Sequence, residues 1–239
     1  DAVKGAFALN LLGLNVTVPY KSDVIPYLTD IDPLAENIGA VNTLVRTETG
    51  YKGYNTDMPG LYRAMCEDGV KVKGEKVLIL GAGGVAMLLL DKGAREAILL
   101  NRTVQKAQEV ADEVNRIAGR KFAKAMPVDA YDTLPAGKQY LAIQATSVGM
   151  YPHCDAVVIE DPAFYEKVYT GYDLIFNPPK TRFMELVEAQ GGKAYNGAKM
   201  LLYQGIIAFE LWTGCKVESW LADKVYERMQ EAKKTEDGK

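Results

Sequence analysis

The sequence is poor in histidine and cysteine, which narrows the chemistry that it can support. With His153 as the only histidine, we expect neither a Ser-His-Asp or Cys-His catalytic group nor a zinc site built from several histidines. The cysteines, Cys66, Cys154 and Cys215, are odd in number and widely spaced. We interpret them as reduced thiols of a cytoplasmic protein, and we expect no metal site. We expect an enzyme of this composition to draw its acid and base from Lys, Asp, Glu or Tyr.

Long apolar runs and an excess of one charge are also missing. No uninterrupted apolar stretch is long enough to span a bilayer, and the first residues lack the layout of a signal peptide. The chain has 28 Lys and Arg against 31 Asp and Glu, with no long run of one sign before its last residues. We therefore expect neither a membrane nor a nucleic-acid partner. With 48% hydrophobic residues, the chain can bury a sizeable core in one or two domains.

An apolar run followed by a glycine-rich turn is the most informative stretch of the chain. Residues 77–80 read VLIL, which is typical of a parallel strand buried on both faces. The next residues fit the dinucleotide-binding pattern G-x-G-x-x-A: Gly81, Ala82, Gly83, Gly84, Val85 and Ala86. The first glycine permits a tight turn, the second lets the backbone approach a pyrophosphate, and the final alanine lets the next helix pack closely. The amides that open this helix suit phosphate oxygens.

The end of the following strand indicates which dinucleotide is bound. The apolar residues 97–100 lead into Asn101, Arg102 and Thr103, at the distance from Gly81 where the cofactor ribose is usually recognised. NAD-binding proteins carry Asp or Glu there, whereas this chain offers a guanidinium and a hydroxyl, which suit a 2′-phosphate. We therefore predict NADP as the cofactor. The alternative is a glycine-rich turn and a surface arginine that bind no ligand.

Strands alternate with helices through the middle of the chain. The pattern predicts strands over 77–80, 97–100, 140–143, 171–176 and 193–195, and helices over 104–117 and 181–190. This alternation predicts an α/β fold of the Rossmann type, with a right-handed, doubly wound parallel sheet that binds ligands at the carboxyl ends of its strands.

Polar residues stand out among apolar neighbours in the first part of the chain. We expect a strand over 15–18, a helix over 22–34 that Pro33 ends, and a strand over 39–45. The first strand would deliver Asn15, Thr17 and Lys21 to a polar pocket, or simply expose them on a sheet edge. Asn42 is either a backbone staple or a ligand contact. Thr56 or Asp57 can cap a helix from 58 to about 66.

Eight motifs, in order, resemble those of the shikimate/quinate dehydrogenase family. They are NVTVPYK (15–21), GAVNTL (39–44), GYNTD (53–57), GAGG (81–84), NRT (101–103), ATSVGM (145–150), FNPPKT (176–181) and MLLYQG (200–205). The resemblance covers nearly the whole chain. It implies a cytoplasmic enzyme of aromatic amino-acid and chorismate biosynthesis, a monomer or homodimer, which interconverts shikimate and 3-dehydroshikimate with NADP.

The resemblance also implies a division into domains and a set of site residues. A partial substrate-binding α/β domain would span 1–57, an NADP-binding Rossmann domain 58–196, and helices returning to the substrate domain 197–239. The implied catalytic residues are Lys21 and Asp57, and the implied substrate contacts are Thr17, Asn42, Asp57, Gln204 and Phe176. The implied cofactor contacts are Gly81, Ala82, Gly83, Gly84, Val85, Asn101, Arg102, Thr103, Thr146, Leu174 and Gly197. Phe176 stands where the family often has a tyrosine, so that hydrogen bond to substrate is lost.

A lysine beside an aspartate is chemically coherent with alcohol oxidation. Removing hydride from a secondary alcohol requires that its hydroxyl proton be taken up as well. We interpret Lys21 as the group that relays this proton and Asp57 as the group that positions it, acting as one coupled pair. Two alternatives stay open: a quinate/shikimate dehydrogenase with broader substrate or NAD use, and a non-catalytic NADP-binding regulator built on the same fold.

The chain departs from the family pattern at several places. The family's opening strand and its serine-containing loop are absent from this sequence, either because the chain is a fragment or because residues were omitted. The segment between Gly84 and Asn101 is short, with an abrupt passage after Leu90 that is a deletion or an omitted turn. Gln144 replaces an asparagine that is common there, and Lys199 stands where glycine is common.

Overall fold

The computed structural model describes the backbone of residues 1–237, with side chains up to residue 232. The chain forms two compact units. The first comprises Asp1–Arg63 and Lys199–Lys239, and the second is the continuous stretch Ala64–Ala198.

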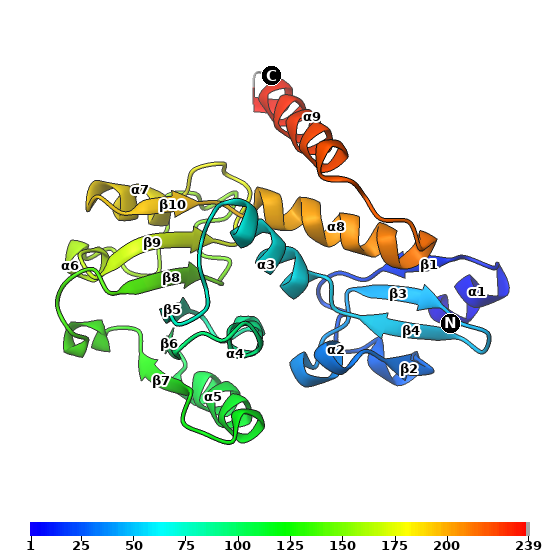
Figure 1. The fold of residues 1–239 in the computed structure, drawn as a ribbon, viewed down its shortest axis with the longest axis horizontal. Helices are drawn as coiled ribbons and strands as arrows, with labels where there is room; N and C mark the ends of the chain where they lie inside the picture. The colour runs from blue at the N-terminus through cyan, green and yellow to red at the C-terminus, as the bar shows by residue number, and fades with distance from the viewer. Residues whose placement is uncertain (238–239) are drawn as a thin grey trace. The chain divides into compact units, whose positions relative to one another are not determined.

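The second unit is built on a six-stranded, all-parallel sheet. Its strands lie in the order β10-β9-β8-β5-β6-β7 (Figure 1). Their bounds are β5 Lys76–Leu80, β6 Glu96–Asn101, β7 Ala123–Pro127, β8 Tyr140–Gln144, β9 Val168–Asp173 and β10 Lys193–Tyr195. The chain runs outward from β5 through β6 to β7, then returns to β8 on the other side of β5. This is the doubly wound order with its switch point between β5 and β8, which confirms the fold predicted from the sequence.

Helices cover this sheet because its strands are apolar on both faces. They are α4 Val85–Asp91, α5 Val104–Ala118, α6 Pro162–Tyr165 and α7 Arg182–Ala189, with a short 3-10 helix η2 at Ala130–Thr133. Leu78 and Leu80 of β5 share a buried cluster with Phe164 of α6 and Phe183 of α7. The alternate residues of β5 point to the other face and are equally buried. Strands covered on both sides explain the unbroken apolar runs in the sequence.

The predicted strand over 171–176 is displaced. The structure begins β9 at Val168 and ends it at Asp173, so Leu174 and Phe176 lie in the loop that follows. Asp173 accepts a hydrogen bond from the Ile175 amide at 2.9 Å, which turns the chain out of the ladder. The apolar residues 174–176 therefore extended the predicted strand too far.

The first unit contains a four-stranded sheet in the order β1-β3-β4-β2. Its strands are β1 Gly13–Asn15, β2 Asp30–Ile31, β3 Thr43–Arg46 and β4 Tyr51–Tyr54. Its helices are α1 Ala2–Ala8, the 3-10 helix η1 Ile25–Tyr27, α2 Pro33–Ile38, α8 Ala198–Thr213, α9 Ser219–Asp237 and the start of α3, Asp57–Glu67. A buried core joins Ala6, Val41, Leu44 and Tyr51. The late helix α8 is tied to the sheet by the Trp212 indole, which donates to the Leu44 carbonyl at 2.8 Å.

Two predicted elements of the first unit are wrong. The strand expected over 15–18 ends at Asn15, and Val18 is 75% exposed because the chain turns after Val16, with the Tyr20 amide donating to the Thr17 carbonyl. The helix expected over 22–34 is absent, because Pro26 lacks an amide proton and only one 3-10 turn forms. Pro33 begins helix α2 instead of ending one, with Asp32 as its N-cap.

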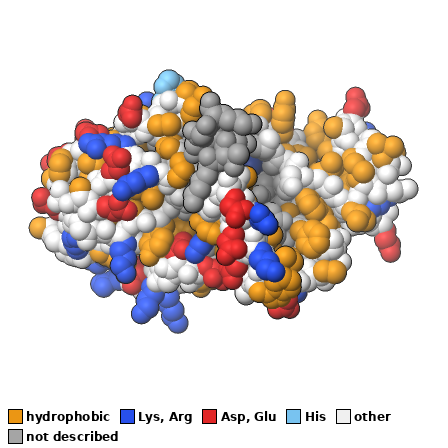
Figure 2. Space-filling model, turned by 90° about the horizontal axis from the view of Figure 1, so that it is seen from above, with side chains coloured by type: hydrophobic (Ala, Val, Ile, Leu, Met, Phe, Trp, Pro, Cys, Tyr) orange, Lys and Arg blue, Asp and Glu red, His pale blue; other side chains and the backbone are white. Residues whose placement is uncertain are grey.

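Charged side chains of both signs are interspersed with apolar ones on the face that Figure 2 displays, in keeping with the nearly balanced composition. None of the helices within residues 1–237 combines the length and apolar character that a bilayer crossing requires.

Two glycines of the first unit give opposite predictions for replacement by alanine. A Cβ on Gly60 of α3 would lie 2.7 Å from the backbone nitrogen of Gln204 in α8, whereas a Cβ on Gly205 would meet nothing within 4 Å. We expect Gly60→Ala to force the helices apart and destabilise the protein by about 1–3 kcal/mol. Gly205→Ala is the control and should stabilise it by up to about 1 kcal/mol, since helical glycine is entropically costly. Urea unfolding of both variants measures the difference, and equal effects would contradict the close helix contact.

Candidate active site

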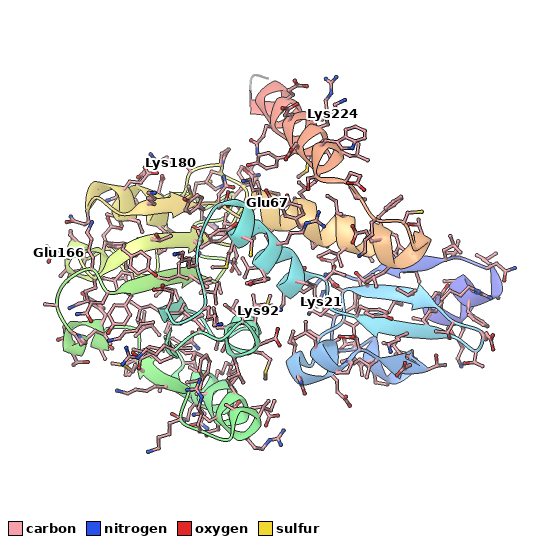
Figure 3. All side chains as sticks on the ribbon, in the orientation of Figure 1. Lys21, Glu67, Lys92, Glu166, Lys180 and Lys224 are labelled. Carbon is pink, nitrogen blue, oxygen red and sulfur yellow. The ribbon has the colours of Figure 1, made fainter. Side chains whose placement is uncertain are left out.

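An ion pair between Lys21 and Asp57 forms the centre of the first unit's polar site. The Lys21 ammonium lies 2.6 Å from the Asp57 carboxylate, and the side chains are 27% and 20% exposed. Figure 3 labels Lys21 close to the start of α3, where Asp57 opens the helix. The Val41 amide donates to the Lys21 carbonyl at 2.8 Å, which fixes the lysine's backbone beside residue 42. Both side chains are therefore anchored while remaining accessible to a ligand.

Asn42 holds the aspartate in place. Its side chain is 3% exposed, and its amide nitrogen donates to the Asp57 carboxylate at 2.9 Å and to the Thr56 hydroxyl at 3.0 Å. Its amide oxygen accepts from the Thr56 backbone at 2.8 Å and from the Thr43 hydroxyl at 3.0 Å. The asparagine is thus a staple between β3 and the start of α3, as one of the two sequence interpretations proposed. A substrate contact by Asn42 stays a prediction.

The helix cap is supplied by Asn55, and not by either of the residues predicted from the sequence. The Asn55 side-chain oxygen accepts hydrogen bonds from the backbone amides of Asp57 at 3.1 Å and Met58 at 3.3 Å. Capping by Thr56 or Asp57 was the expectation, and it is wrong. Because Asn55 takes that role, the carboxylate of Asp57 is left for Lys21 and Asn42. Asn, Thr and Asp all cap helices well, so the order of the three residues carries no signal that separates them.

The other predicted substrate residues of the first unit are less tightly placed. Thr17 is exposed in the turn after β1, and Gln204 of α8 donates to the Leu201 carbonyl of its own helix at 3.1 Å. Within the described residues, no hydrogen bond joins either side chain to the Lys21–Asp57 pair. Their roles stay predictions.

The glycine turn of the second unit has the geometry that a dinucleotide needs. Gly81 follows β5 at the switch point with φ of +122°, a conformation that favours glycine. A Cβ there would approach the Ala145 carbonyl and the Thr146 side chain at 3.3 and 3.2 Å, so this turn packs on the loop after β8. A Cβ on Gly83 would meet nothing within 4 Å, which leaves room above the backbone for a phosphate group. These residues fit the pyrophosphate of a dinucleotide.

The strand next to the glycine turn ends in the residues that are predicted to face a cofactor ribose. Asn101 ends β6 and donates from its side chain to the Thr103 carbonyl at 3.0 Å, which shapes the loop before α5. Arg102 and Thr103 are exposed at this end of the sheet. A guanidinium and a hydroxyl placed there suit a 2′-phosphate.

Two fully buried polar residues, Gln144 and Asp173, end the neighbouring strands β8 and β9. They are paired in register, and the Gln144 amide nitrogen lies 3.5 Å from the Asp173 carboxylate. Burial raises the pKa of Asp173 to about 6, although hydrogen bonds from Thr181 and the Ile175 amide lower it in part. In the sequence, Gln144 stood out only as a departure from the family pattern. Asp173 was not recognised, although its position inside an apolar run was the available signal.

The remaining predicted residues lie in the loops beyond β9. Leu174 and Phe176 follow the strand, and Phe176 is 37% exposed. Gly197 donates from its amide to the Ile175 carbonyl at 2.8 Å, and a Cβ there would lie 2.2 Å from the Leu174 carbonyl. Only glycine fits this approach, which supplies a packing reason for Gly197 in addition to its predicted cofactor contact.

Comparison with known proteins agrees with this geometry. Residues 1–44 match the family described as shikimate dehydrogenase substrate binding domain, 64–132 the shikimate / quinate 5-dehydrogenase family and 197–229 the shikimate 5'-dehydrogenase C-terminal domain. A shikimate dehydrogenase (NADP(+)) of Carboxydothermus hydrogenoformans is 39% identical over 218 residues, which cover 90% of this chain and 76% of that relative.

Solved structures give the same result. Shikimate 5-dehydrogenase from Thermus thermophilus, in complex with NADP(H) and shikimate, has a TM-score of 0.81 and 32% identity, covering 95% of this chain and 82% of that one. Quinate dehydrogenase from Corynebacterium glutamicum, in complex with NAD, has a TM-score of 0.84 and 28% identity, covering 96% and 81%.

A glycine turn at the switch point of a doubly wound sheet, in a chain that also pairs a lysine with an aspartate, is the organisation of a dinucleotide-dependent oxidoreductase. The identity to the curated relatives narrows this class. The chain belongs to the shikimate dehydrogenase family.

The raised pKa of Asp173 gives a prediction about stability. Its folded-state pKa of about 6 lies above the ordinary 3.8, so the group favours folding at low pH, and this contribution is lost as the pH rises through 6. The unaltered protein loses this contribution as the pH rises from 5 to 8, whereas Asp173→Asn does not. We therefore expect the difference in thermal stability between the two to shift in favour of Asp173→Asn by roughly 1 kcal/mol, or a few degrees, over that range.

Asp161→Asn is the control for this measurement. Asp161 also accepts an amide hydrogen bond and a hydroxyl, but it is exposed, and the Tyr131 hydroxyl lowers its pKa. Its effect on the melting temperature should be the same at pH 5 and pH 8. A pH-independent effect of Asp173→Asn would show that the buried carboxylate ionises without penalty.

Proposed function

We propose that this protein catalyses the reversible, NADP-dependent reduction of 3-dehydroshikimate to shikimate in aromatic amino-acid biosynthesis. The observation that carries the proposal is the Lys21–Asp57 pair, held at 2.6 Å and fixed from behind by the buried Asn42. Membership of the family supports the overall reaction, because curated relatives of about this similarity are named as shikimate dehydrogenases (NADP(+)). The substrate is thus a small polar molecule with hydroxyl groups and a carboxylate.

In the proposed mechanism the first unit binds the substrate and handles its proton. Lys21 takes the hydroxyl proton as the alcohol is oxidised and returns it in the reverse direction. Asp57 accepts hydrogen bonds from Lys21 and Asn42 and keeps the ammonium aimed at the reacting hydroxyl. Thr17 and Gln204 contribute further hydrogen bonds to the substrate's polar groups. Phe176 contributes an apolar contact, since its ring has no hydroxyl to donate.

The second unit holds the cofactor in this proposal. The turn Gly81–Gly84 and Val85 receive the pyrophosphate, and Asn101, Arg102 and Thr103 hold the adenosine ribose with its 2′-phosphate. Thr146, Leu174 and Gly197 lie on the other side of the switch point and contact the nicotinamide end. Bound NADP supplies the hydride acceptor, or in the reverse direction the donor.

Two alternatives have specific support. A quinate/shikimate dehydrogenase is favoured by the similarity to the quinate dehydrogenase of C. glutamicum, which is in complex with NAD. A non-catalytic NADP-binding regulator would need the second unit but not the Lys21–Asp57 pair, so retention of that pair argues against it. The cytoplasmic location proposed from the cysteines agrees with three free thiols, of which Cys66 and Cys215 are exposed.

The experiment that tests the function is the initial rate of NADPH formation with shikimate, measured beside quinate and beside NAD. We expect shikimate with NADP to be the fastest combination, and Lys21→Ala to lower its turnover by about 100-fold or more because proton transfer is lost. NADPH affinity of the variant, followed by fluorescence, should stay within about twofold, as Lys21 belongs to the substrate unit.

Lys52→Ala is a matched control for this variant. Lys52 lies in the same unit, is 28% exposed and pairs with Asp30 at 2.8 Å. Its replacement removes a comparable ion pair but leaves the proposed site intact. Its turnover should be unchanged. Equal losses of turnover and NADPH affinity in Lys21→Ala would contradict the proton-transfer role of Lys21. Faster turnover of quinate than of shikimate would favour the quinate/shikimate dehydrogenase. NADPH binding by the unaltered protein without any turnover would favour the regulator.

Arg102 gives a separate test of cofactor choice. Arg102→Gln removes the cation proposed to bind the 2′-phosphate, so we expect NADPH affinity to fall about tenfold or more while NADH affinity stays unchanged. Arg116→Gln is the control, because Arg116 lies on α5 of the same unit and pairs with Glu113. Titrations of both reduced cofactors measure the effect. An equal loss for NADPH and NADH would place Arg102 outside the phosphate site.

A further inference from the structure

The side chain of Gln144 organises the loop that follows β8. Its amide oxygen accepts hydrogen bonds from the backbone amide and the hydroxyl of Thr146, at 2.6 and 2.7 Å. Its amide nitrogen donates to the carbonyls of Thr146 and Val148, at 3.2 and 3.1 Å. The carboxamide of Gln144 therefore fixes residues 145–148, the loop on which the Gly81 turn packs, and its nitrogen also faces the Asp173 carboxylate.

Asp173 connects this loop to the next one. Its carboxylate lies 3.5 Å from the Gln144 amide nitrogen, accepts the Ile175 amide at 2.9 Å and accepts the Thr181 hydroxyl at 2.5 Å. Thr181 in turn caps α7, and the Ile175 carbonyl receives the Gly197 amide. One fully buried carboxylate thus joins the loop after β8, the loop after β9 and the start of α7.

The partners of Asp173 are polar but uncharged, and this makes the site costly for folding. A carboxylate buried among neutral donors loses its hydration without gaining a cation, and its raised pKa of about 6 agrees with that cost. The Asp173 carboxylate interacts electrostatically with the buried Tyr165 phenol of α6. The pKa of this phenol is raised mainly by its own burial and in smaller part by Asp173. A neutral residue would serve stability better, so the role of the carboxylate lies in the geometry that it imposes.

The loops that Asp173 joins lie on one side of the switch point. In a doubly wound sheet the dinucleotide extends across that point. In the proposed function, the loop after β6 therefore holds the adenosine half with its 2′-phosphate, and the loops after β8 and β9 hold the nicotinamide half. We propose that Asp173 is a positioning residue for the nicotinamide half of the cofactor, acting through Gln144, Ile175 and Thr181. This inference rests on the proposed function.

Two probes separate the halves of the cofactor: NADPH, and adenosine 2′,5′-bisphosphate, which carries the adenosine and 2′-phosphate but no nicotinamide. For Asp173→Ala at pH 7.5, we expect NADPH affinity to fall about tenfold, because the loops lose the acceptor that fixes them. The affinity for adenosine 2′,5′-bisphosphate should stay within about twofold of the unaltered protein. Calorimetric titration of the full chain with each probe measures both.

Asp161→Ala is the matched control for Asp173→Ala. Asp161 accepts the amide two residues ahead at 2.9 Å and a hydroxyl at 2.5 Å, as Asp173 does, but it precedes α6 and is exposed. Its loss should change neither affinity. If Asp173→Ala does not fold, Asp173→Asn provides the test, because it keeps the volume of the side chain but leaves one oxygen to accept where the carboxylate accepts from Ile175 and Thr181 through two. It should weaken NADPH selectively as well.

The outcomes are distinct. A selective loss of NADPH affinity in either variant, with the control unchanged, supports the positioning role. Equal losses for both probes would indicate general damage to the unit and overturn it, as would unchanged affinity for NADPH. If the unaltered protein bound neither probe, the proposed cofactor itself would be wrong, a result that is separate from any effect of the variants.

Discussion

The buried amide of Asn42 is the constraint on which the first unit's site depends. A primary amide without hydrogen-bond partners would be costly in the interior. The fold supplies partners for Asn42 by bringing β3 against the start of α3, where Thr56 and Asp57 accept hydrogen bonds from its amide nitrogen. The Asp57 carboxylate is therefore oriented before any ligand binds. Lys21 then meets it from a turn whose backbone is held by Val41. The proposed catalytic pair and the asparagine that holds it come from three separate segments, so the pair has little freedom to lose when substrate binds, which is the general advantage of a preorganised site.

The sequence predicted the second unit well because the physical signal there is strong. Buried parallel strands need continuous apolar residues, so runs such as Val77–Leu80 and Tyr140–Ile143 were found within a residue or two of their limits. The glycine turn was equally clear, since Gly81 has a positive φ that few other residues adopt. The weak point was the end of β9. Asp173 interrupts an apolar run, and only the structure shows that its carboxylate turns the chain there through the Ile175 amide.

The first unit was predicted less well because its elements are short and depend on tertiary contacts. A three-residue strand such as β1 has no periodicity to detect. The local sequence is equally compatible with Pro33 ending one helix or beginning another. Likewise, Asn55, Thr56 and Asp57 are all good caps, so the side chain that caps and the one that pairs with Lys21 could not be told apart from the sequence. The lysine and aspartate themselves were identified by resemblance to the family, and the structure shows how they meet.

The close approach of α3 and α8 at Gly60 has a consequence for the order in which the protein can form. Gln204 touches the backbone of residue 60, and Trp212 bonds to Leu44, so the first unit is completed by residues that are synthesised after the entire second unit. The second unit is continuous and can fold as soon as it leaves the ribosome. Residues 1–63 must instead wait for α8 before their core is closed. During synthesis, the segment that carries Lys21 and Asp57 thus completes its fold after the second unit does, although it precedes that unit in the chain.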